Sequence, residues 1–188
     1  ANRKHGVHKT YFANGNAKSE QSFVNGTPDG TATSWHESGA KKSVDTYVEG
    51  VKSGPSSAWG KGGVLSSEGA HAAGAKSGTW TTYHKSGRKA AQTSYTAGLA
   101  TGEFTAWYDQ ENAQKRVQGT YTVTEGASAA TGKWATWYAN GTNATELDHT
   151  AGTAKVYNVR GQLWFDLTAT ADGWNDARLA VDVKGGFK

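Results

Sequence analysis

The stretch Gly78-Thr-Trp-Thr-Thr-Tyr-His-Lys-Ser-Gly87 contains the pattern from which the fold of this chain follows. A glycine precedes a run of threonines and aromatic residues, and a second glycine comes directly after a serine. Threonines and rings favour a β-strand, because β-branched and aromatic side chains pack well on a pleated surface. The Ser-Gly pair tolerates the positive φ of a tight hairpin turn. The stretch therefore predicts a strand that ends in a turn.

The same pattern recurs along the chain, which is the signature of a repeat architecture. Five glycines are spaced 24 residues apart, and the sixth equivalent, Gly132, comes six residues late. These glycines are Gly6, Gly30, Gly54, Gly78 and Gly102. Position +5, counted from each of them, is always aromatic: Tyr11, Trp35, Trp59, Tyr83, Trp107 and Trp137. Position +9 carries the turn glycines Gly15, Gly39, Gly63, Gly87 and Gly141, and Glu111 is the one exception.

Each copy predicts a β-hairpin with a second strand at about +11 to +18, such as residues 90–96. A ring at +17 and a glycine at +20 follow, and a Gly-x-x-x-Gly connection, such as residues 50–54, is expected to turn the chain back. In the longer fifth copy, we expect residues 125–131 to form a lengthened turn, with Tyr121 as the matching ring and Gly126 as the matching glycine.

Residues 1–152 are thus predicted to form six tandem hairpin repeats of about 24 residues. Residues 153–188 are predicted to form a partial repeat and a C-terminal cap or assembly element, with strands at 155–159, 162–170 and 178–183. No helical periodicity is visible. The predicted fold is all-β: an elongated, single-layer antiparallel meander with a C-terminal β cap.

The composition argues against a nucleic-acid-binding protein and against a membrane-spanning helix. Hydrophobic residues make up 36% of the chain and the net charge is +4, without the concentrated basic stripe that a nucleic-acid partner favours. No stretch approaches the roughly 20 apolar residues of a membrane helix. The chain has no cysteine and is rich in small residues. We therefore expect a soluble protein that is secreted or displayed on the cell surface.

The pattern Gly-x-Trp-x-x-Tyr/Trp, followed by Asn-Gly and by Tyr-x-x-Gly-x-x-x-Gly, resembles the bacterial MORN-type repeats, in particular the variant of YwqK-like proteins. Residues 78–87 and 132–141 carry the clearest matches, and the resemblance extends over about residues 5–161. The loops here are richer in Ala, Thr and Ser than the charged connections of that family. The resemblance implies a scaffold or interaction module and leaves the partner open.

No pattern indicates an enzyme, and no cofactor or metal is expected. Four histidines fall at ring positions, +6 or +17, so we interpret them as replacements for rings: His36, His84, His71 and His149. Three glutamates share position +14 and predict a sparse, solvated row: Glu20, Glu68 and Glu146. There is no nucleophile elbow, phosphate loop or dinucleotide fingerprint.

Two functions stay open. The first is a non-catalytic recognition module whose +5 rings contact a protein or glycan partner, unless those rings pack the sheet itself. The second is a structural subunit that self-associates into an extracellular filament through open sheet edges and the C-terminal strands.

Overall fold

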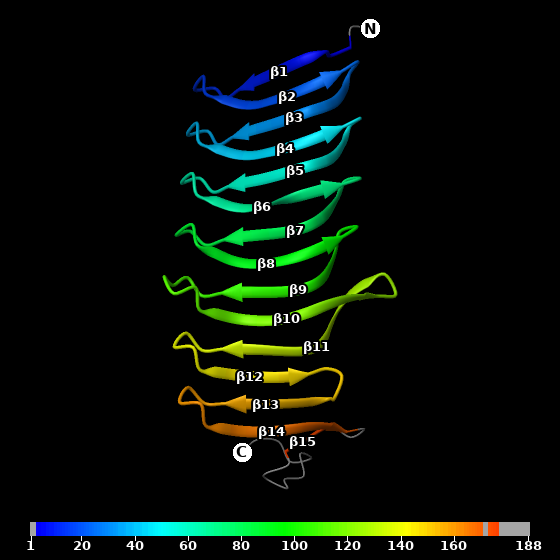
Figure 1. Cartoon of the computed structure of the whole chain (residues 1–188). Coiled ribbons are helices and arrows are strands. Elements are labelled where there is room, and N and C mark those ends of the chain that lie inside the picture. Colours follow the sequence, from blue (N-terminus) through cyan, green and yellow to red (C-terminus); the bar gives the residue numbers. More distant parts are fainter. Residues whose placement is uncertain (1–2, 171–172, 177–188) are drawn as a thin grey trace. The chain divides into compact units, whose positions relative to one another are not determined.

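The computed structural model describes residues 3–170 and 173–176, and this part of the chain contains strands and turns but no helix. The chain divides into two compact units, Ala1–Ala100 (unit 1) and Thr101–Lys188 (unit 2). Figure 1 labels the strands along the chain. Their bounds are β1 Gly6–Tyr11, β2 Ala17–Val24, β3 Thr27–Trp35, β4 Lys41–Val48, β5 Val51–Trp59, β6 Leu65–Ala72, β7 Ala75–Tyr83, β8 Lys89–Thr96, β9 Leu99–Trp107, β10 Lys115–Thr124, β11 Ala127–Trp137, β12 Asn143–Asp148, β13 Thr153–Tyr157, β14 Leu163–Thr170 and β15 Gly173–Asp176.

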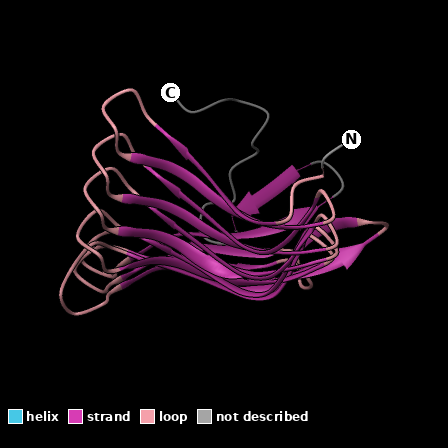
Figure 2. Ribbon diagram, turned by 90° about the horizontal axis from the view of Figure 1, so that it is seen from above, coloured by secondary structure: helices cyan, strands magenta, loops and turns pink. Residues whose placement is uncertain are grey.

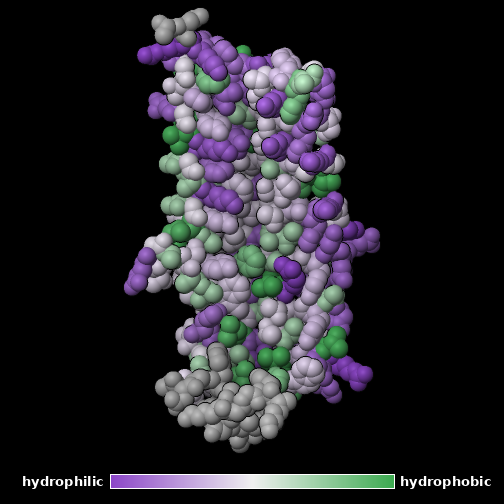
Figure 3. All heavy atoms as spheres, turned by 180° about the vertical axis from the view of Figure 1, so that it is seen from behind, coloured by the Kyte–Doolittle hydropathy of each residue, from purple (hydrophilic) through white to green (hydrophobic). Residues whose placement is uncertain are grey.

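Within each unit, every strand pairs antiparallel with the strand that follows it in sequence, and this confirms the predicted all-β, single-layer meander. The core is correspondingly thin. Among the described residues, the buried hydrophobic side chains are Trp80, with 8% of its surface exposed, and Ala106, with 1%. Figure 3 shows one face, on which hydrophobic residues form separate spots between hydrophilic ones. Both faces of the sheet are therefore largely accessible to solvent.

The turns after β1, β3, β5, β7 and β11 are built as the +9 glycines predict. In the turn from His36 to Ala40, the N–H of Gly39 donates to the carbonyl of His36 (2.9 Å), and the N–H of His36 donates to the carbonyl of Ala40 (2.8 Å). This is a type I turn followed by a left-handed residue. The turn glycines named above have φ between 80° and 87°, which a residue with a Cβ rarely adopts.

The turns on the opposite edge are shorter than predicted, because residues 51–54 belong to β5 rather than to a connection. Only Glu49 and Gly50 form the turn, with φ of 49° and 85°. Two residues with positive φ reverse the chain within a type I′ turn. Gly54, at φ 117°, lies inside β5, where the register shifts opposite Thr46. Bulges of this kind bend a strand, and Figure 2 shows the strands curved.

The extra residues of the fifth copy do not lengthen the turn at 125–131, so that prediction is wrong. Glu125 and Gly126 form a two-residue turn with φ of 51° and 76°, and residues 127–131 belong to β11. The additional length is spread over the 108–114 loop, β10 and β11, and the β10–β11 hairpin projects beyond its neighbours in Figure 1. Tyr121 pairs with Gly102, as Tyr47 pairs with Gly30, so it is the matching ring.

The partial seventh repeat is a complete hairpin formed by β13 and β14, with Gly161 in its turn at φ 80°. β13 ends at Tyr157, two residues before the predicted 155–159 strand would end. β15 then pairs with β14. The predicted strand at 178–183 lies outside the described residues, and the proposed domain boundary after residue 152 stays a prediction.

Candidate functional site

The two faces of the sheet differ in how they use their aromatic residues. Because side chains alternate along a strand, positions +2 and +17 lie on one face, here called the +17 face, and positions +3, +5 and +14 lie on the other, the +5 face. Contacts between side chains agree with this division. His71 at +17 meets Trp80 at +2, and Glu68 at +14 accepts a hydrogen bond from Tyr83 at +5.

On the +17 face of unit 1, rings pack against each other and against the backbone. The rings of His71 and Trp80 meet edge to face with centroids 5.1 Å apart, and the Lys76 ammonium lies 4.4 Å from the Trp80 centroid. The Nδ1 atom of His71 is buried and has no hydrogen-bond partner. Burial lowers the pKa of His71, and the nearby Lys52 ammonium lowers this pKa further. This cluster stabilises the sheet.

The +17 face of unit 2 is packed in the same way. The Trp134 ring stacks on Phe104 at 5.9 Å and meets Tyr121 edge to face at 5.1 Å. His149 lies at the next ring position, 6.4 Å from Trp134. His71 and His149 therefore occupy ring positions and make ring contacts, as the sequence predicted.

The +5 face carries the predicted row of rings. Tyr11 is 61% exposed, and the other members are half-buried: Trp35, Trp59, Tyr83, Trp107 and Trp137. Side chains at +6 fix the backbone beside some of these rings. His36 Nε2 lies 3.1 Å from the carbonyl oxygen of Trp59, and the Tyr108 hydroxyl donates to the carbonyl of Trp137 (2.9 Å).

The three glutamates at +14 lie on the +5 face, and each has a partner. Lys9 forms an ion pair with Glu20 (2.8 Å). The hydroxyls of Tyr83 and Tyr157 donate to Glu68 and Glu146. The hydrogen bond to Glu68 raises the pKa of Tyr83, while burial and then the bond to Glu146 raise the pKa of Tyr157. The predicted row is therefore a set of cross-strand pairs between neighbouring strands.

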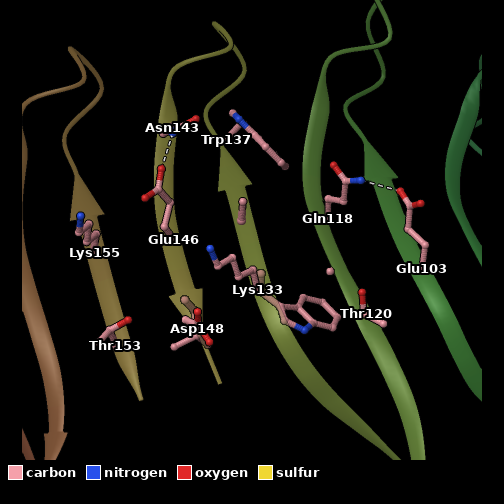
Figure 4. Close-up of a pocket in the computed structure, with 14 residues that line it drawn as sticks. Glu103, Gln118, Thr120, Lys133, Trp137, Asn143, Glu146, Asp148, Thr153 and Lys155 are labelled. Carbon is pink, nitrogen blue, oxygen red and sulfur yellow. Dashed lines mark hydrogen bonds between the residues drawn. The ribbon is translucent and has the colours of Figure 1, made fainter. Parts of the chain in front are cut away.

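A groove of about 710 Å³ lies on the +5 face of unit 2, over strands β9 to β13. Figure 4 shows the side chains that line it. Trp137 stands near one end of β11, and Lys133 extends from the same strand toward β12. Lys155 comes from β13, and three carboxylates also line the groove: Glu103, Glu146 and Asp148. The groove thus combines the rings of Trp134 and Trp137 with groups of both charges.

Hydrogen bonds hold the carboxylates of the groove in place. Asn143 Nδ2 donates to Glu146 Oε1 (2.8 Å), and Gln118 Nε2 donates to Glu103 Oε1 (2.6 Å). Asp148 Oδ1 accepts the N–H groups of Thr150 (2.9 Å) and Ala151 (3.0 Å). These two backbone donors hold the pKa of Asp148 below its usual range, with the N–H of Ala151 the larger cause. The polar rim of the groove is therefore preorganised.

The sequence pattern singled out Trp137 and Glu146 but missed the groove. Lys133 and Lys155 occupy positions +1 and +3 of their copies, where threonine is the commonest residue in the other copies, so the repeat pattern gave no signal for a lysine. Within the described residues, no group of three or more His, Asp or Glu side chains is arranged to hold a metal ion. The described part of the chain also has no helix long and apolar enough to cross a membrane.

Comparison with known proteins supports the repeat type. The search of curated proteins found no match. The family model described as the MORN repeat variant matches residues 4–25, which span β1, the first turn and β2. The resemblance to MORN-type repeats is therefore confirmed, and the matched segment is the first copy of the 24-residue repeat.

Proposed function

We propose that this protein is a non-catalytic recognition scaffold that binds a protein or glycan partner on its +5 face. The observation that carries the proposal is the different use of rings on the two faces. Rings at +2 and +17 make ring–ring contacts, and Trp80 is buried, whereas the rings at +5 recur once in each copy and none of them is buried. Aromatic side chains with one accessible face are effective anchors at interfaces.

The repeat architecture supports the same function. A single-layer sheet leaves both faces open, and each hairpin adds one ring at a fixed spacing. Repeat proteins commonly use such extended surfaces to bind a partner through several weak contacts. Trp35 and Trp59 in unit 1 are the central members of this row.

The proposal is tested by screening the immobilised chain against a glycan array and a peptide-display library. The double variant Trp35→Ala/Trp59→Ala is expected to lose binding to the ligands that are found. The control Val24→Ala/Val48→Ala changes the last residues of β2 and β4, whose side chains are 47% and 51% exposed. This variant is expected to keep binding. Equal binding by both variants, or no ligand in either library, would contradict the proposal.

Self-association is a second candidate function, because β1 pairs with β2 and with no other strand in the described part of the chain. An unpaired strand edge is a template for strand addition. Light scattering and negative-stain microscopy over a concentration series test this candidate. Ordered oligomers that grow with concentration support it, and a monomer at every concentration contradicts it.

We also propose that the protein works outside the cell or on its surface, and the absence of cysteine and richness in small residues support this. Immunodetection in culture medium, surface and cell fractions tests the location. Detection only inside the cells would contradict it.

A further inference from the structure

We propose that the groove on the +5 face of unit 2 binds a short neutral oligosaccharide, with Trp137 as the platform on which a sugar ring stacks. This inference rests on the proposed recognition function and assigns a ligand class to one part of the +5 face. The volume of about 710 Å³ lies within the range of roughly 300–1,000 Å³ that is common for sites of small ligands.

The ring of Trp137 is available to a ligand. Within the described residues, no other ring stacks on the indole and no protein atom accepts a hydrogen bond from its Nε1–H. Its backbone carbonyl is fixed by the Tyr108 hydroxyl at 2.9 Å, which limits movement of the strand beneath it. The flat C–H face of a sugar is apolar and packs on an aromatic ring, while its hydroxyls remain free to bond at the sides.

The polar groups of the groove suit hydroxyls, which both donate and accept hydrogen bonds. Lys133 and Lys155 form no ion pair with any described residue and can donate to sugar oxygens. Glu103 uses Oε1 for Gln118 and Thr105, so its Oε2 can accept from a sugar hydroxyl. Donors and acceptors thus alternate across the groove, from Glu103 on β9 to Lys155 on β13 (Figure 4).

The charges of the groove disfavour ligands of high charge. A polyanion would meet Glu103, Glu146 and Asp148, and a polycation would meet Lys133 and Lys155. These five charges sum to −1, which is close to neutral. A neutral ligand with many hydroxyls can use both kinds of group without a net electrostatic penalty.

Unit 1 offers a matched control. Trp59 has the same repeat position as Trp137, and Glu68 occupies the position of Glu146, but Pro55 and Thr81 stand where the groove has Lys133 and Lys155. Trp59 therefore lacks the two lysines of the groove, and a different lysine, Lys41, lies with its Nζ 5.9 Å from the centroid of the Trp59 ring. A ligand that needs only an exposed tryptophan would use both sites, whereas the proposed ligand needs Trp137.

The test is isothermal titration of the whole chain with neutral hexasaccharides (cellohexaose, xylohexaose and chitohexaose) and with oligogalacturonate as the anionic comparison. We expect at least one neutral sugar to bind, with affinity lowered about tenfold or more in Trp137→Ala and unchanged in Trp59→Ala. Lys155→Ala, a change at an exposed side chain, is expected to weaken binding by a smaller factor. Tighter binding of oligogalacturonate than of the neutral sugars would overturn the proposal that the ligand is neutral.

A second measurement does not depend on whether Trp137→Ala folds. The indole N–H resonance of Trp137, assigned by its loss in Trp137→Phe, is expected to shift when the neutral sugar is added to the unmodified chain. No binding of any neutral sugar, or binding that leaves this resonance unmoved, would refute the groove as their site. If the Trp35 and Trp59 row still binds a peptide in that case, the proposed recognition function stands and only the sugar site fails.

Discussion

The indole of Trp80 lies directly over the backbone of Gly69 on the neighbouring strand, so that a Cβ added to Gly69 would come within 2.3 Å of Trp80 Cδ2. Unit 2 repeats the arrangement with Trp134 over Gly119, where the added Cβ would come within 2.0 Å. These two close contacts lie in a sheet with few buried side chains. A missing side chain on one strand thus makes room for the largest side chain on the next.

Gly69→Ala is therefore expected to destabilise the chain by about 1–3 kcal/mol, since the indole or the strand must move to admit the methyl group. Gly62→Ala is the control, because a Cβ there meets nothing within 4 Å. Its free energy of unfolding should stay within about 0.5 kcal/mol of the unmodified chain. Urea unfolding followed by tryptophan fluorescence measures both. Equal stability of the two variants would show that the indole of Trp80 leaves room for a methyl group at Gly69.

Gly69 is at position +15 of its copy and Trp80 is at position +2 of the next copy. Other copies have different residues at these two positions, and this leads to a second prediction. Gln21 pairs with Ala32, and Leu147 pairs with Ala154, so a larger residue on one strand faces a small one on the other. Trp80→Ala alone is expected to cost about 3–5 kcal/mol. In the double variant Gly69→Gln/Trp80→Ala, which copies the Gln21 and Ala32 pair, the glutamine refills part of the space. The loss of stability in the double variant should be smaller than the sum of the losses in the two single variants, which a double-mutant cycle measures. Additive losses would show that the glutamine does not refill the space left by the indole.

The sequence period was sufficient to predict most of the strands and the positions of the turn glycines, because these depend on local alternation and turn chemistry. It could not predict which residues face each other across strands. Gly69 comes opposite Trp80 because the register of the pairs Ser67–Thr82 and Glu68–Thr81 continues for one more residue before it shifts ahead of Ala70, and the position of such a shift has no clear signal in a single strand.

The groove shows a second limit of sequence reasoning. Its lining comes from five strands, and Lys133 and Lys155 depart from the threonine that is commonest at their repeat positions. A periodic analysis gives weight to what recurs, whereas a binding site in a repeat protein can depend on residues that differ between copies. The placement of the fifth copy's extra residues in the 108–114 loop, β10 and β11 was missed for a related reason, since Gly and Ala in residues 126–130 suggested a loop.

The two-residue turns give a prediction about backbone strain. Ala73, in the turn between β6 and β7, has φ of 48°, a left-handed conformation that costs an alanine roughly 1–2 kcal/mol. Ala73→Gly is expected to stabilise the chain by about 1 kcal/mol, because the relief of strain exceeds the added entropy of the unfolded state.

The control for this variant is Ala72→Gly, one residue earlier in β6, which should lose about 0.5–1 kcal/mol because glycine weakens a strand. Thermal unfolding of the two variants distinguishes strain relief from a general effect of glycine. A loss of stability in both would show that Ala73 is not strained.

The environment of His71 makes the stability of unit 1 depend on pH. The folded state holds its pKa below the ordinary value of 6.5, chiefly through burial and then through the Lys52 ammonium, with Lys76 acting in the same direction and Asp45 opposing. At pH above this ordinary value, the imidazole is neutral in both folded and unfolded chains. Below it, the unfolded chain takes up the proton first, so the free energy of unfolding falls until the pH reaches the pKa of the folded state.

His71→Phe is expected to remove this part of the acid dependence, because phenylalanine keeps the edge contact with Trp80 and cannot take up a proton. Urea unfolding at pH 7.5 and at pH 5 measures the change, and the difference between the two pH values should be smaller in the variant than in the unmodified chain. His149→Phe is the matched control, since His149 also meets a tryptophan at position +17 but lies in unit 2. If His149→Phe reduces the acid dependence as much as His71→Phe does, the burial of His71 beside Lys52 is not its source.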